Sequence, residues 1–271
     1  MKRYKLHLLI AFAITGFASA SYAVETKVEP TAPKVEEPLA PKPVDANTTR
    51  NIVDALASRH YVSIPLDDHQ SEKIFSAYLE DLDPSRSYFL ASDIAKFDKY
   101  RTTLDDSLSR GDVSPAFDIF NVYQRRVEDR FENVIATLKK GVDKFDFTRN
   151  ETLLLDRKNA PWATDEAALN DLWRKRVKEE ILNLELAGKA PEKIQELLIK
   201  RYENRLDRTR QTNSDDVYQV YMNSFTRTYD PHTQYFSPRT SENFNINRST
   251  CNSDGWRSSK FVTAMSSKPG L

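Results

Sequence analysis

The chain has 271 residues, and its 40 basic and 40 acidic residues leave no net charge. This balance gives no electrostatic reason to expect nucleic acid or an acidic membrane surface as a partner. There are six glycines and one cysteine, Cys251, which excludes an intrachain disulfide and argues against glycine-rich phosphate-binding loops.

The first 23 residues have the organisation of a secretory signal peptide. Three basic residues among the first five precede a mostly apolar stretch from Leu6 to Ala18, and Ser21 and Ala23 suit a cleavage site after Ala23. The apolar stretch is shorter than the roughly 20 residues that a membrane-spanning helix needs. We therefore expect export across the inner membrane, with no transmembrane anchor after cleavage. An uncleaved anchor and cleavage after Ala20 are the alternatives.

Residues 24–46 differ in composition from the sequence that follows. Prolines alternate with lysine and glutamate in this segment, and aromatic residues are absent. Such a segment buries too little apolar surface to offset the entropy of ordering. Residues 24–46 are therefore predicted to be a flexible, extended linker.

From Asn47 to about residue 229, apolar residues recur at helical spacing and predict an all-α fold of at least seven helices. The first helix is expected to begin with Asn47 or Thr48 as its N-cap, and the second to end before Asp83. A third helix is expected to run from a Ser92 cap to Gly111.

Proline and glycine mark the boundaries of the later helices. One helix is expected to begin at Ser114–Pro115 and to end at Gly141 in a left-handed cap. Further starts are expected at Thr164, at Pro191 and at Asn213 or Ser214. No strand pattern of comparable strength is present, and the aromatic residues are expected in the core rather than around a ligand.

Known catalytic and cofactor-binding motifs are absent from the sequence. No serine stands in a G-x-S-x-G or S-x-x-K motif, and dinucleotide and P-loop fingerprints are missing. The histidines after the signal segment, His60, His69 and His232, are not paired at the one-turn spacing that helical metal sites favour. We therefore expect no catalytic residue, no metal site and no small-molecule cofactor in this chain.

A proline-bounded segment near the end of the helical pattern differs from its surroundings. Its notable residues are Asp230, Pro231, His232, Thr233, Tyr235, Ser237 and Pro238. The two prolines interrupt helix, and Asp230 can fix a turn by accepting backbone N–H groups. One interpretation is a rigid structural connector, and the other is an acid–base pair of Asp230 and His232. The connector is preferred because no nucleophile accompanies the pair.

Four segments carry a resemblance to a known family: Asn159–Ala163, Leu169–Leu186, Gln211–Asp216 and the proline-bounded segment. Together they resemble the tail-specific proteases, carboxy-terminal processing peptidases of the Gram-negative periplasm, over roughly residues 47–245. The resemblance implies a large periplasmic enzyme that binds apolar C-termini of envelope proteins through a PDZ domain. It also implies cleavage by a serine activated by a lysine, without metal or nucleotide. The helical domain, residues 47–246, is then a scaffold that helps to dock substrate or an adaptor.

The sequence departs from the family pattern after residue 246. No position matches the catalytic serine or lysine, and a PDZ domain needs on the order of 80–100 residues, more than remain. Residues 247–271 fit neither a PDZ strand nor a helix, which predicts an aberrant, disordered tail. A frameshift near Asn247 is the preferred explanation, and a deliberate short paralogue is the alternative.

Because neither catalytic residue is matched, the chain is expected to be proteolytically inactive. Two further interpretations remain beside that of an inactive scaffold. The first is a helical binding module that engages an envelope adaptor or competes with the intact protease. The second is a non-functional product that is degraded in the periplasm.

Overall fold

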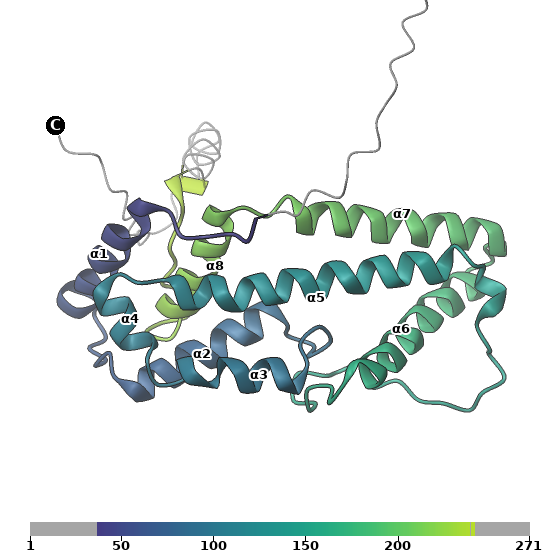
Figure 1. Cartoon of the computed structure of the whole chain (residues 1–271), viewed down its shortest axis with the longest axis horizontal. Helices are drawn as coiled ribbons and strands as arrows, with labels where there is room; N and C mark the ends of the chain where they lie inside the picture. Colours follow the sequence, from purple (N-terminus) through teal and green to yellow (C-terminus); the bar gives the residue numbers. More distant parts are fainter. Residues whose placement is uncertain (1–36, 239, 242–271) are drawn as a thin grey trace, which may run out of the picture. The chain divides into compact units, whose positions relative to one another are not determined.

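The computed structural model describes residues 37–238, 240 and 241 (Figure 1). These residues form eight α-helices and two short 3-10 turns, without a β-strand, so the predicted all-α fold is confirmed. Within this part of the chain, no helix combines the length and apolar character that crossing a membrane requires. The predicted signal peptide, residues 24–36 of the predicted linker and the predicted aberrant tail lie outside the described residues.

The elements in chain order are α1 (Pro43–Arg59), α2 (Asp68–Leu82), α3 (Ala91–Phe97), η1 (Asp98–Tyr100), α4 (Leu104–Arg110), α5 (Ser114–Leu138), η2 (Val142–Lys144), α6 (Glu166–Leu186), α7 (Pro191–Arg210) and α8 (Ser214–Thr226). The expected starts at Ser114, Pro191 and Asn213 are confirmed, because the Asn213 side chain caps α8 and Pro191 occupies the first turn of α7. The cap of α6 is Asp165, one position after the expected Thr164.

Helix α1 begins at Pro43, so the predicted start at Asn47 or Thr48 is wrong and residues 43–46 are helical rather than linker. Proline fits the first turn, where its missing N–H removes no helical hydrogen bond. The Asp45 carboxylate also accepts the N–H of the preceding Lys42 at 2.7 Å. These two features allow a helix to start inside a proline-rich segment.

The chain before α1 is bonded to helix α5. The Leu39 N–H donates to Asn121 Oδ1, and Asn121 Nδ2 donates to the Leu39 carbonyl, both at 2.9 Å. A single amide side chain therefore satisfies both backbone groups of one extended residue.

The continuous helix expected from Ser92 to Gly111 is divided into α3, η1 and α4. After the break, the Leu104 N–H at the start of α4 donates to Ser71 Oγ of α2, at 2.9 Å. Helix α3 is capped by Leu90 rather than by the expected Ser92. The expected end at Gly111 is confirmed: this glycine has φ 78°, and a Cβ there would lie 2.4 Å from the Ala46 carbonyl oxygen.

Helix α5 has 25 residues and a length of roughly 37 Å. It ends at Leu138, and Gly141 with φ 112° and ψ 142° does not form the expected left-handed cap. Figure 1 shows α7 lying along α5 and α6 crossing beside its C-terminal half. The large apolar residues that recur at helical spacing along α5 are buried: Phe117, Phe120, Val127, Phe131, Val134, Ile135 and Leu138.

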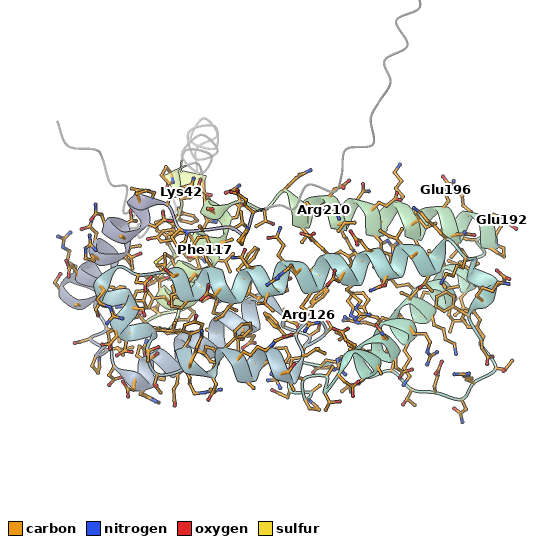
Figure 2. The ribbon with its side chains drawn as sticks, viewed as in Figure 1. Lys42, Phe117, Arg126, Glu192, Glu196 and Arg210 are labelled. Atoms are coloured by element: carbon orange, nitrogen blue, oxygen red, sulfur yellow. The ribbon has the colours of Figure 1, made fainter. Side chains whose placement is uncertain are left out.

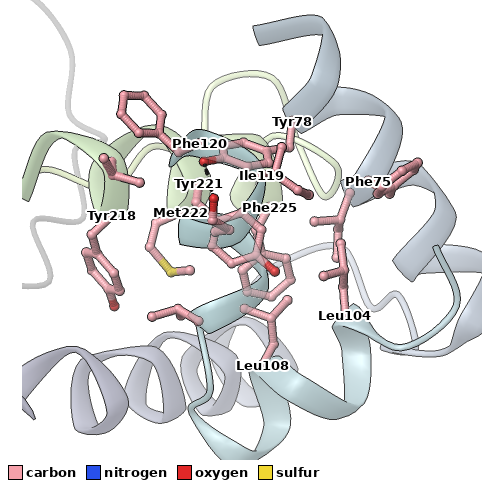
Figure 3. Close-up of a cluster of buried hydrophobic side chains, with 14 of the residues drawn as sticks. Phe75, Tyr78, Leu104, Leu108, Ile119, Phe120, Tyr218, Tyr221, Met222 and Phe225 are labelled. Atoms are coloured by element: carbon pink, nitrogen blue, oxygen red, sulfur yellow. Dashed lines mark hydrogen bonds between the residues drawn. The ribbon is translucent and has the colours of Figure 1, made fainter. Parts of the chain in front are cut away.

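Two hydrophobic cores share α5. The first gathers α1, α2, α4, the N-terminal half of α5 and α8, and the second gathers the C-terminal half of α5 with α6 and α7. In the first core, Tyr78 and Tyr221 pack edge to face with ring centroids 5.1 Å apart, beside Phe225 (Figure 3). Aromatic side chains thus fill the cores, as the sequence predicted.

Candidate functional site

The segment after α8, residues 230–238, is here called the connector, and its backbone is bonded to one face of that helix. The three bonds join Gln219 Oε1 to the Ser237 N–H (3.0 Å), Asn223 Oδ1 to the Tyr235 N–H (2.7 Å) and the Thr226 hydroxyl to the Thr233 carbonyl (3.0 Å). Two extended residues span about 6.6 Å, and the steps of four and three residues between the helical partners span about 6 and about 4.5 Å, so alternate connector positions meet successive turns of α8. The connector is therefore held in one register on the helix.

Asp230 fixes the turn at which the connector begins. Its Oδ1 accepts the His232 N–H at 2.8 Å and lies 3.2 Å from His232 Nδ1, while Oδ2 accepts the Tyr61 hydroxyl at 2.5 Å. The Tyr61 hydroxyl, followed by the His232 N–H, holds the pKa of Asp230 below its ordinary value. The same hydrogen bond raises the pKa of Tyr61.

The structure brings Asp230 and His232 together at the surface. The His232 side chain is 92% exposed, and in the described part of the chain its only hydrogen-bond partner is Asp230. No serine, threonine or cysteine is bonded to the imidazole there. The pair therefore has the geometry of a turn and lacks a positioned nucleophile.

Further contacts tie the connector to α1 and α8. His60 Nε2, at the end of α1, lies 3.0 Å from Thr233 Oγ1. The Tyr235 ring packs edge to face against Tyr218, with centroids 5.3 Å apart, and burial raises the pKa of Tyr235 to about 12. Ser237 is buried, and its hydroxyl lies 2.9 Å from Thr240 Oγ1. The connector is therefore fastened along its length to the helical body.

The residues to which the backbone of residues 230–238 is bonded were not predicted from the sequence. His60 is separated from Thr233 by 173 positions, so no local pattern joins them. The only signal for Gln219 and Asn223 was their spacing of four residues on α8, which places polar side chains on one helix face.

A polar network lies elsewhere, between α3, α5 and α6. Arg126 of α5 is labelled in Figure 2. Its Nε and Nη2 lie 2.9 and 3.1 Å from the Asp93 carboxylate, and its Nη1 is bonded to Glu166. A hollow of about 340 Å³ beside it is lined by acidic and basic side chains of α5, including Asp129 and Arg130. These opposite charges offset one another. In the described residues, no group of three or more histidine, cysteine, aspartate or glutamate side chains could hold a metal ion.

The sequence of the helical body matches a known domain family. Residues 52–239 match the tail specific protease N-terminal domain family, so the chain belongs to this family. The matched region ends one residue after the connector.

One relative is the tail-specific protease of Haemophilus influenzae. It is 41% identical over 198 residues, which are 73% of this chain and 28% of that protein. The chain thus spans little more than a quarter of the relative's length. The resemblance predicted from the sequence is confirmed for the helical domain.

Proposed function

We propose that the helical body is the N-terminal scaffold and docking domain of a periplasmic tail-specific protease, and that it performs no peptide cleavage itself. The observation that carries the proposal is the family match over residues 52–239. The second half of the proposal is supported by the same match, because the matched family is an N-terminal domain of the protease and not the whole enzyme. The helical surface serves to dock substrate or an adaptor.

In this proposal, the connector fixes the direction in which the chain leaves the helical body. The three bonds from α8 to alternate connector residues support this role, because they hold residues 233–237, which belong to no helix or strand. The Asp230–His232 pair then caps a turn and does not transfer protons during catalysis.

Periplasmic localisation is part of the same proposal and rests on the sequence of residues 1–23. Cell fractionation should recover the protein with periplasmic markers, and N-terminal sequencing should give Val24 as the first residue. Recovery in the cytoplasm with Met1 retained would contradict the localisation.

The activity claim is tested with the purified chain and a substrate protein that ends in apolar residues. A matched substrate that ends in charged residues is the control. We expect no cleavage of either one. Cleavage of the apolar-ended substrate alone, which persists after a second purification from a protease-deficient host, would overturn the proposal.

The docking claim needs a separate experiment. Crosslinking of the purified chain in an envelope extract should capture specific proteins, and excess unlabelled chain should suppress the capture. If the same proteins are captured equally by the urea-unfolded chain, the docking role is contradicted.

A further inference from the structure

Two exposed leucines precede Arg157 in the long loop between η2 and α6, and a second arginine, Arg176, lies on α6. Leu154 and Leu155 are 58% and 75% exposed, although they are adjacent and apolar. Arg157 follows them in the loop, and Arg176 on α6 is close enough to lower the pKa of Arg157, an effect second to that of burial. These four residues are called the Leu–Arg surface.

The loop that carries the leucines is fastened on both sides of them. On one side, Arg174 and Lys178 of α6 bind the Glu151 carboxylate at 2.5 and 2.6 Å. On the other side, Arg157 donates to two backbone carbonyls of the turn after α2, at 3.2 and 3.3 Å. A loop held in this way keeps its leucines in water instead of folding them inwards, which is typical of an interaction site.

Arg157 and Arg176 converge on Ser85. Arg157 Nε donates to the Ser85 carbonyl at 3.2 Å, and Arg176 Nη2 lies 3.4 Å from Ser85 Oγ. Neither arginine forms an ion pair with any other described residue. A guanidinium group has five N–H donors, so both retain donors for a further acceptor.

The carboxylate of Asp83, whose charge acts to raise the pKa of Arg157, is engaged elsewhere. Asp83 is buried and accepts the backbone N–H groups of the turn that follows it, at 2.8–3.1 Å. Three backbone donors therefore share its charge, and the two guanidinium groups remain without a direct counter-ion.

We propose that the Leu–Arg surface binds an acidic, apolar peptide segment of a partner protein. Side-chain carboxylates of the segment pair with Arg157 and Arg176, because guanidinium and carboxylate groups form paired hydrogen bonds. Apolar side chains of the same segment cover Leu154 and Leu155.

The probe is a fluorescein-labelled twelve-residue peptide of repeated Leu-Leu-Asp-Asp with an amidated C-terminus, titrated with the intact chain by fluorescence anisotropy. A peptide with asparagine in place of aspartate is the matched control. The acidic peptide should bind at least about tenfold more tightly, which corresponds to about 1.4 kcal/mol. Its affinity should fall as salt is raised, because salt screens exposed charges.

Variants separate this surface from the rest of the molecule. Arg176→Gln and Leu155→Ser should each weaken binding of the acidic peptide by about fivefold or more, on the order of 1 kcal/mol. Arg176 is chosen over Arg157 because Arg157 fastens the loop. Arg208→Gln and Leu186→Ser, on exposed side chains of α7 and α6, are matched controls and should leave the affinity unchanged. Circular dichroism should show that all four variants are folded.

Several results would overturn the proposal. Failure of the acidic peptide to bind contradicts it, as does equally tight binding of the asparagine peptide. Unchanged affinity in both Arg176→Gln and Leu155→Ser also contradicts it. Equal losses in the control variants would also overturn it. Displacement of the bound peptide by vesicles of anionic phospholipid, but not by unlabelled peptide, would assign the surface to membranes instead.

Discussion

Replacing Asn223 with alanine is expected to release the middle of the connector while the helical body stays folded. Asn223 Oδ1 accepts the Tyr235 N–H at 2.7 Å, and alanine offers no acceptor. The net contribution of a neutral hydrogen bond is about 0.5–1.5 kcal/mol, and a donor left partly buried without a partner adds to the loss. We therefore expect the connector to open more readily by about 1.5 kcal/mol. That is roughly a tenfold rise in its open population.

The assay is native-state hydrogen exchange followed by mass spectrometry, which measures local opening. Peptides that cover residues 233–237 should exchange about tenfold faster in N223A, whereas peptides from α5 should keep their protection. Asn204→Ala, on an exposed position of α7, is the control and should change neither. Unchanged exchange in residues 233–237, or an equal rise over α5, would refute the reasoning that a single side chain secures the connector.

The remaining predictions concern stability. Gly111→Ala should lower the free energy of unfolding in urea by about 3 kcal/mol, because a Cβ at φ 78° meets a backbone carbonyl oxygen at 2.4 Å. Gly188→Ala, with φ 76° and nothing within 4 Å, should cost only about 1 kcal/mol, and equal losses would refute the steric argument. Asp83→Asn should cost about 3 kcal/mol in the same assay, since one acceptor oxygen becomes a donor facing buried N–H groups. The basic side chains of Arg174 and Lys178 lower the pKa of Glu151 from 4.5 to about 2. The Glu151 carboxylate therefore stabilises the fold above pH 4.5, and this contribution is lost as the pH falls towards 2. NMR titration of the Glu151 carboxyl group should show this low midpoint, and an ordinary midpoint would contradict it.

The helix boundaries divide into those that depend on local chemistry and those that depend on distant contacts. Pro191 and Asn213 were predicted correctly because a first-turn proline and an N-cap side chain act within a few residues. The break before Leu104 was not predictable, since the Leu104 N–H is bonded to a serine 33 positions earlier, which no local pattern reveals. The proline-rich composition of residues 24–46 predicted a linker up to residue 46, but one of these prolines, Pro43, occupies the first turn of α1.

The candidate site divides in the same way. Pro231 and Pro238 marked the connector, because proline interrupts a helical pattern that is otherwise regular. The side chains that receive its backbone were not predictable, since glutamine and asparagine on a helix give no sign of what they bind. The choice of partner is made by the fold, which brings residues 233–237 back along α8.

Helix α5 has a consequence for how the molecule melts. Its N-terminal half is buried in one core and its C-terminal half in the other, with no loop between them. If either half of α5 unfolds, the other half loses helical continuity and its core loses packing contacts. The two cores are therefore thermodynamically linked. The domain should therefore denature in a single cooperative step, and a fragment cut within α5 should leave both pieces without a stable tertiary structure.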